Sequence, residues 1–117
     1  MIPAFQSALS GLRAFGTRIE SNGNNIANAE TNGFKKTRVL LEEATPSGVR
    51  PRIEKVNTEG TTVFQETGSG QEPVELSNVE LSGEIPETII NSRMYEANLK
   101  TIQVADDMIG NLLKIKS

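Results

Sequence analysis

The chain has 117 residues, of which 36% are hydrophobic and only 4% aromatic, and its formal net charge is −3. This length suffices for one domain, whose core must be thin because there is little bulky apolar material to bury. The acidic balance argues against nucleic-acid binding. The sequence holds no Cys and no His, which excludes imidazole bases, disulfides and the usual zinc and iron–sulfur ligand sets.

Motifs for catalysis and membrane insertion are also missing from the sequence. No apolar run reaches the roughly 18 residues of a membrane span, and the first residues lack the basic and apolar regions of a secretory signal. No phosphate-binding or dinucleotide-binding glycine motif is found. The adjacent Asp106 and Asp107 would point about 100° apart on a helix, so we expect them to be solvated. We therefore expect no enzyme, no cofactor, no metal site, no small-molecule substrate and no membrane insertion.

Residues 4 to 30 show the periodicity of a helix that packs against another helix, as in a coiled coil. Four apolar residues recur every seven positions: Phe5, Leu12, Ile19 and Ile26. Gly16 and Gly23 lie on the same seam. They either weaken the helix or let a partner helix approach closely.

The end of this helix is rich in amides, at Asn22, Asn24, Asn25 and Asn28. Asparagine is a poor helix former because its side chain competes for backbone hydrogen bonds. The segment is therefore either an ordinary frayed terminus or a place where amides bond across a subunit interface. Gly33 suits the left-handed conformation that ends a helix, and we expect it to cap this one.

The middle of the chain contains short strand candidates separated by turn signals, at residues 37–41, 48–56 and 61–65. Residues 66–73 resemble a flexible loop. Such a middle either forms a small hairpin or stays partly disordered.

Charge is unevenly distributed along the middle of the chain. Six basic residues gather in its first half: Lys35, Lys36, Arg38, Arg50, Arg52 and Lys55. No Lys or Arg occurs between Val56 and Ser92, where every charged residue is a glutamate. Two explanations remain open. The charges are either solvated surface or complementary surfaces of subunits that meet head to tail.

A second long helix is expected to run to Lys114. Ser77 and Glu80 have the spacing of a capping box. Because Pro86 is comfortable only in a first turn, either a short turn precedes it or the main helix starts near Ile85. Two apolar stripes predict two packing partners. The stripe that contains Tyr95, Ile102 and Ile109 is assigned to the first helix. The other is assigned to neighbouring subunits: Ile90, Met94, Ala97, Val104, Met108 and Ile115.

Two segments carry a resemblance to a known family. Residues 24–35 read N-N-I-A-N-A-E-T-N-G-F-K and residues 92–103 read S-R-M-Y-E-A-N-L-K-T-I-Q. The first resembles the N-terminal signature of bacterial flagellar axial proteins of the rod and hook class, close to N-I-A-N-A-x-T-x-G-[FY]-[KR]. The second resembles their C-terminal signature around R-x-Y-E-A-N. Asn32, where many members have proline, and Pro86 depart from the family pattern.

The resemblance implies a mainly α fold with a small β or irregular insert. Long N- and C-terminal helices would pack as an antiparallel coiled-coil core. We expect one domain in three parts, at residues 1–38, 39–76 and 77–117. The predicted assembly interface combines residues from both signatures and the helix seam: Asn24, Asn25, Asn28, Thr31, Gly33, Phe34, Lys35, Arg93, Tyr95, Asn98, Ile102 and Ile109.

The resemblance further implies a structural subunit of the basal-body rod, built into a hollow helical tube in the periplasmic space. Its partners would be copies of itself, other rod and hook proteins and the flagellar type III export machinery, which needs no cleaved signal peptide. The chain length favours the proximal-rod group. The alternatives are a distal-rod or hook subunit and a soluble helical adaptor or export-linked binding protein that does not polymerise.

Overall fold

The computed structural model describes residues 2–116. The molecule is elongated, with extents of 81 × 24 × 19 Å. Two helices, α1 (Ile2–Ala27) and α2 (Leu81–Lys116), enclose four strands in the sequence. The strands form two separate antiparallel hairpins, β1 (Thr37–Glu43) with β2 (Val49–Lys55) and β3 (Thr62–Thr67) with β4 (Gly70–Glu75). The expected mainly α fold with a small β insert is thus confirmed.

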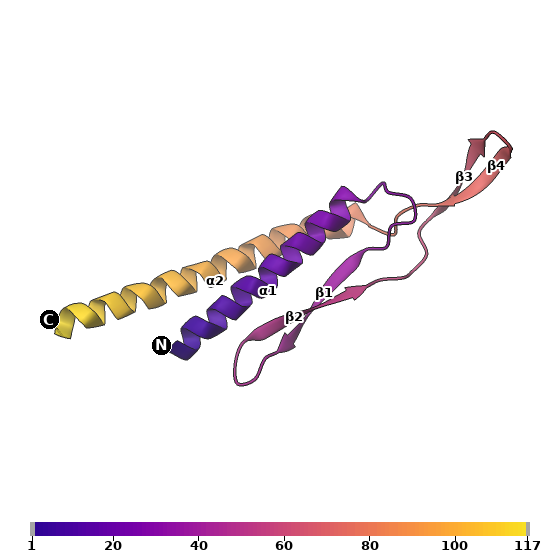
Figure 1. The fold of residues 1–117 in the computed structure, drawn as a ribbon. Coiled ribbons are helices and arrows are strands. Elements are labelled where there is room, and N and C mark those ends of the chain that lie inside the picture. Colours follow the sequence, from indigo (N-terminus) through magenta and orange to yellow (C-terminus); the bar gives the residue numbers. More distant parts are fainter. Residues whose placement is uncertain (1, 117) are drawn as a thin grey trace.

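The two helices lie side by side and run antiparallel, so that both chain ends lie at one end of the pair (Figure 1). Helix α2 has 36 residues and α1 has 26. The C-terminal part of α2 therefore projects beyond the start of α1 (Figure 1). The more specific expectation, a coiled coil, stays a prediction.

Small residues bring the helices together. Ala8 and Ala14 of α1 and Ala105 of α2 are buried. A Cβ on Gly11 would collide with the side chain of Asn98, and one on Gly16 would touch the ring of Tyr95. Close approach of the helices therefore requires glycine at Gly11, whereas Gly16 lies beside α2 at an ordinary contact distance. Gly23, in contrast, has open space around it.

The β1–β2 hairpin lies along α1 and is held by side chains of that helix. Ser10 Oγ accepts a hydrogen bond from the backbone N–H of Val49 (3.1 Å), and Arg18 Nε donates to the carbonyl of Val39 (3.2 Å). Val39 is buried against this surface. The hairpin is thus part of the same body as the helix pair.

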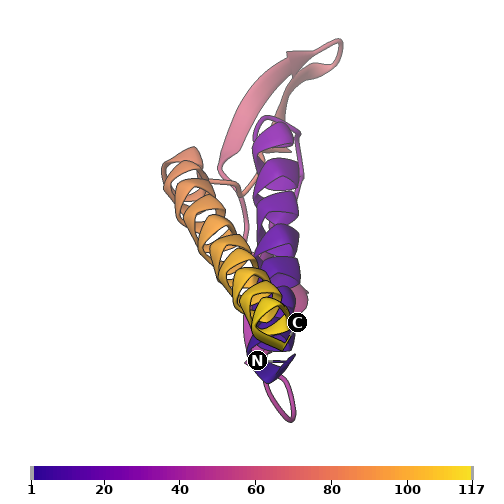
Figure 2. The ribbon, with the colours of Figure 1, turned by 90° about the vertical axis from the view of Figure 1, so that its left-hand side faces the viewer.

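The β3–β4 hairpin extends away from the rest of the molecule, past the ends of both helices where α2 begins (Figures 1 and 2). The structure corrects the prediction of a flexible loop at residues 66–73, since most of this segment belongs to β3 and β4. The chain reverses between Thr67 and Gly70, where Thr67 Oγ1 donates to the Gly70 carbonyl (2.9 Å). Gly70 takes a φ of 116°, which favours glycine.

Two helix boundaries, the end of α1 and the start of α2, were predicted wrongly. Helix α1 ends at Ala27. Gly33 has the expected left-handed conformation, with a φ of 73°, but turn residues separate it from the helix, so it does not cap α1. Asn28 Nδ2 bonds back to the Asn24 carbonyl (2.9 Å), which gives the backbone an alternative to another helical turn. Ser77 does not cap α2. The helix begins at Leu81 and continues through Pro86 without a break.

Candidate assembly surfaces

The interior beside the start of β1 is polar. Asn22, Asn25, Glu84 and Asn91 are buried, and Asn25 and Asn91 are the largest fully buried side chains described. The Glu84 carboxylate accepts hydrogen bonds from Asn22 Nδ2 (2.7 Å) and Asn25 Nδ2 (3.1 Å). Asn91 Nδ2 donates to Asn22 Oδ1 (2.7 Å). The four side chains form a polar network that joins α1 to α2.

Asn25 extends this network to β1. Its Oδ1 accepts from the Thr37 N–H (3.0 Å) and its Nδ2 donates to the Thr37 carbonyl (2.8 Å). The amide therefore pairs both backbone groups of one strand residue, as a neighbouring strand would. This corrects the premise that the signature amides need another subunit to be satisfied. The Asn25 amide finds its hydrogen-bond partners within the chain, so unsatisfied hydrogen bonding is no longer an argument for placing Asn25 in the predicted interface.

The other signature residues before β1 lie closer to the surface. Asn24 and Thr31 are exposed and Asn28 is half-buried. They are linked to one another through Asn28, whose Oδ1 accepts from Thr31 Oγ1 (3.1 Å). Gly33 is exposed as well, and its N–H donates to the Glu75 carbonyl (2.8 Å). These residues remain available to a neighbour, and their assembly role stays a prediction.

Phe34 and Lys35 enter a junction where segments before β1, before β3 and before α2 meet. The Lys35 ammonium forms an ion pair with Glu75 and donates to the Thr58 carbonyl (3.0 Å). The Glu75 carboxylate also accepts from the Gly60 N–H (3.1 Å). The hydrogen bond from Lys35, followed by that from Gly60, lowers the pKa of Glu75 below its ordinary value of 4.5.

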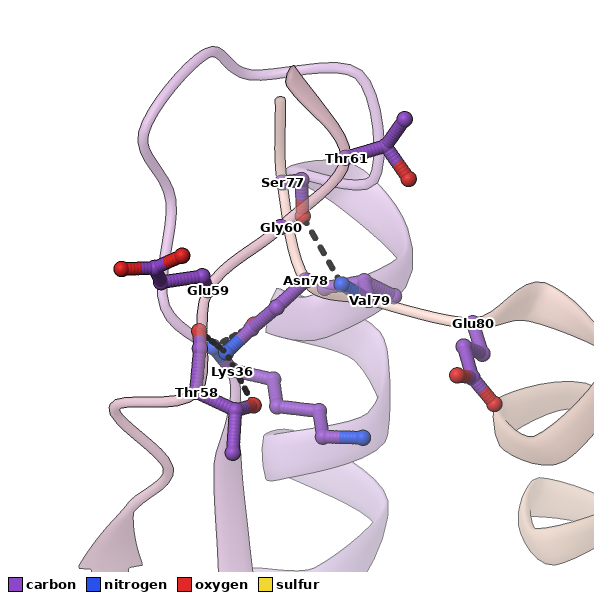
Figure 3. A pocket seen from close by; sticks show the side chains of 9 residues that line it. All are labelled: Lys36, Thr58, Glu59, Gly60, Thr61, Ser77, Asn78, Val79 and Glu80. Carbon is purple, nitrogen blue, oxygen red and sulfur yellow. Dashed lines mark hydrogen bonds between the residues drawn. The ribbon is translucent and has the colours of Figure 1, made fainter. Parts of the chain in front are cut away.

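Asn78 holds the centre of this junction, a position that sequence reasoning missed. Its Oδ1 accepts from the Lys36 N–H (2.7 Å), and its Nδ2 donates to the Val56 (2.8 Å) and Thr58 (3.0 Å) carbonyls. Figure 3 shows Asn78 pointing toward Thr58 across a polar pocket between these segments. A single asparagine followed by a helix start is too common a pattern to reveal this role. The side chain thus ties together the segments that precede β1, β3 and α2.

The C-terminal signature residues divide between the helix interface and the surface. Asn98 faces Gly11, and Tyr95 lies over Gly16. Ile102 is half-buried, whereas Ile109 is exposed at the edge of the helix pair. Arg93 is exposed and lies 3.9 Å from Glu96, so its guanidinium faces solvent on α2. The structure thus gives Tyr95 and Asn98 a role within the chain and leaves Arg93 and Ile109 open to a neighbour.

The second stripe of α2 has no cover within the described chain. Its large members are exposed: Ile90, Met94, Val104, Met108 and Ile115, the last at 81%. Around the projecting end of α2, Leu112 and Leu113 are exposed too. Monomers rarely expose so many contiguous apolar side chains, and such surfaces mark contacts with other molecules. The stripe that we assigned to neighbours is therefore free to receive them.

Two further features are missing from residues 2–116. No three acidic side chains of this range come together to hold a metal ion. No helix in it has both the length and the apolarity of a membrane span.

The N-terminal and the C-terminal segments of the chain each match a known protein family. Residues 5–35 match the family described as flagella basal body rod protein, and residues 71–115 match the C-terminal family of flagellar basal body rod FlgEFG proteins. The chain belongs to the flagellar basal-body rod and hook protein family. The two matches cover α1 with its signature turn and β4 with nearly all of α2.

Individual relatives agree with the family. The chain is 30% identical over 110 residues to the flagellar basal-body rod protein FlgG of Bacillus subtilis, which covers 94% of this chain and 38% of that protein. It is 30% identical over 88 residues to the flagellar hook protein FlgE of Borreliella burgdorferi, over 75% of this chain and 20% of the hook protein. The chain thus spans well under half the length of these relatives, and rod and hook proteins are both among them.

Proposed function

We propose that this chain is a structural subunit of the flagellar basal-body rod. The observation that carries the proposal is the uncovered apolar stripe of α2, which runs along a helix pair too thin to bury it. A helical tube made of such pairs would cover the stripe of each subunit with its neighbours. The short segment between the helices supports the proximal-rod group over the distal-rod and hook alternative.

Several further features belong to the same proposal. The partners are copies of the chain, other rod and hook proteins and the type III export machinery. The location is the rod in the periplasmic space, reached by the flagellar type III export route. The three parts at residues 1–38, 39–76 and 77–117 act as one domain, and the two terminal helices form the coiled-coil core of the tube. No enzymatic activity is proposed.

A deletion strain tests the proposal directly. We expect loss of motility and purified basal bodies without complete rods, with both restored by the gene supplied in trans. Complete rods and normal motility in the deletion strain would overturn the proposal. A soluble adaptor would give a different result, because its protein would be absent from purified wild-type basal bodies.

The exposed signature amides give a second test. Replacing Asn24 and Asn28 together with alanine removes side chains that are partly or fully exposed and do not enter the buried network. We expect a folded subunit with impaired rod assembly, measured by motility and by the yield of basal bodies. Wild-type motility of this double variant would show that the two asparagines are not part of the assembly interface.

A further inference from the structure

The dipeptide Asn-Gly occurs twice in the chain, at Asn22-Gly23 and at Asn32-Gly33. Asparagine is a thermolabile residue, because its side-chain amide can be lost to attack by the backbone nitrogen of the next residue. A following glycine makes this attack easiest, since glycine has no Cβ and its nitrogen can approach the side-chain carbonyl carbon without a steric clash. Both dipeptides therefore have the composition that favours deamidation, and their surroundings decide which of them reacts.

The first dipeptide lies within α1, where both reacting groups are held. Asn22 is 2% exposed, its Nδ2 donates to the Glu84 carboxylate (2.7 Å), and its Oδ1 accepts from Asn91 Nδ2 (2.7 Å). The helical backbone at Gly23 is fixed, because the N–H groups inside an α-helix bond to carbonyls of the preceding turn. The Gly23 nitrogen therefore cannot turn toward the Asn22 side chain while α1 is folded.

The second dipeptide lies in the turn between α1 and β1. Asn32 is exposed, and no hydrogen bond within residues 2–116 holds its side chain. Gly33 has a φ of 73° and open space on the side where a Cβ would stand. Neither residue is enclosed by the rest of the described chain, so the side chain of Asn32 is free to reorient toward the backbone.

One interaction restrains the second dipeptide. The Gly33 N–H donates to the carbonyl of Glu75 at the end of β4 (2.8 Å). The nitrogen must lose this hydrogen before it can attack, so the reaction requires conformations in which the bond is open. Such openings are local, because β3 and β4 pack against no other helix or strand of the described chain. They leave α1 folded.

We propose that Asn32 is a deamidation site and that the hydrogen bond from Gly33 to Glu75 controls its rate. Solvent base removes the Gly33 N–H proton, and the nitrogen attacks Asn32 Cγ. The N–Cγ bond forms, the Cγ–Nδ2 bond breaks and ammonia leaves, which gives a succinimide. Water then opens this ring at either carbonyl, to aspartate or to isoaspartate, and no group is oxidised or reduced. The inference concerns the isolated chain and does not depend on the proposed function.

Peptide mapping of the full chain after incubation in mildly alkaline buffer tests the site. Fragment spectra distinguish the two asparagines, and digestion in heavy-oxygen water marks any conversion that occurs during the digestion. In the folded chain we expect Asn32 to convert at least about tenfold faster than Asn22, and in urea we expect the two rates to agree within about threefold. Equal rates in the folded chain, an unreactive Asn32, or an undiminished difference in urea would overturn the proposal.

A pair of variants tests control by the hydrogen bond. Glu75→Ala removes a carboxylate that is bonded to two neighbouring segments, and so loosens the residue whose carbonyl restrains Gly33. Glu66→Ala is the matched control at an exposed position of β3. We expect Asn32 to convert at least about threefold faster in Glu75→Ala and at the wild-type rate in Glu66→Ala, with Asn22 unchanged in both.

The other outcomes contradict this control. An unchanged rate at Asn32 in Glu75→Ala, or an equal rise in both variants, would show that the hydrogen bond does not set the rate. A parallel rise at Asn22 would show that the chain reacts through general unfolding and not through a local opening.

Discussion

The two ends of the helix pair are built in opposite ways. Where α1 meets β1, the interior is polar, and Asn22, Asn25, Glu84 and Asn91 lie buried. Where α2 projects beyond α1, the surface is apolar, with Leu112, Leu113 and Ile115 exposed. A monomer would be expected to show the reverse of both arrangements.

The contrast between the polar and the apolar end suggests two different roles, one within the subunit and one between subunits. Buried polar groups must be matched by specific partners, so they fix one arrangement of α1, α2 and β1. Exposed apolar groups have no directional requirement and are stabilised by whatever apolar surface covers them. The polar end thus fixes the arrangement within the subunit, and we propose that the apolar end and the stripe of α2 make the contacts between subunits.

Breaking the polar end should have the largest effect on the isolated chain. Asn25→Ala leaves the Thr37 N–H unpaired and removes one hydrogen bond each from the Glu84 carboxylate and from the Thr37 carbonyl, which keeps Ser21 Oγ (3.2 Å) as a donor. We therefore expect the free energy of unfolding to fall by about 2–4 kcal/mol. Urea unfolding measures this. Asn24→Ala, at an exposed neighbouring position, should change stability by less than about 0.5 kcal/mol. Equal effects of the two variants would show that the buried network is not what fixes the subunit.

The junction below the β3–β4 hairpin should be the next most sensitive region. A Cβ on Gly60 would collide with the carbonyl of Leu76, so Gly60→Ala should cost about 1–3 kcal/mol or displace the hairpin. Hydrogen exchange of the Leu76 amide, which bonds to the Thr61 carbonyl (2.8 Å), reports the change. Gly68→Ala is the matched control because it has open space around it. If the Leu76 amide exchanged at the wild-type rate in Gly60→Ala, the close contact between Gly60 and Leu76 would be contradicted.

Acid should loosen the same junction slightly. The pKa of Glu75 is lowered in the folded state, so its contribution is present above the ordinary value of 4.5 and is lost as the pH falls through the lower folded value. We expect the Gly60 amide to exchange more readily, relative to other amides, as the pH drops below 4.5. Glu75→Gln should remove this pH dependence. A wild-type profile that matches Glu75→Gln would exclude the carboxylate as its source.

Sequence patterns predicted the features that follow from periodicity. The seven-residue spacing of apolar residues indicated both helices, and the second stripe of α2 was correctly separated from the stripe that meets α1. Gly16 does lie beside a second helix, but a Cβ there would make only ordinary contact with Tyr95. These features depend on residue type and spacing alone, and both are visible in the sequence.

Features that depend on long-range partners could not be predicted. Nothing local shows that Asn25 pairs with Thr37 or that Glu84 enters the interior, because the partners are separated by 12 and 59 residues. The boundary errors have a similar origin. The side chain of Asn28 bonds back to the Asn24 carbonyl, and the helix ends there rather than at Gly33. Pairing of β3 with β4 orders a segment whose composition is typical of a loop.

The central claim is that the exposed stripe of α2 joins subunits. Val104→Asp with Met108→Asp places two charges on this stripe, and Gln103→Asp with Asn111→Asp places the same charges on exposed polar positions of the same helix. Incorporation of each variant into purified basal bodies is the direct measurement. We predict that both unfold within about 0.5 kcal/mol of the wild type, and that the stripe variant alone is excluded from basal bodies. Normal incorporation of the stripe variant would contradict the account.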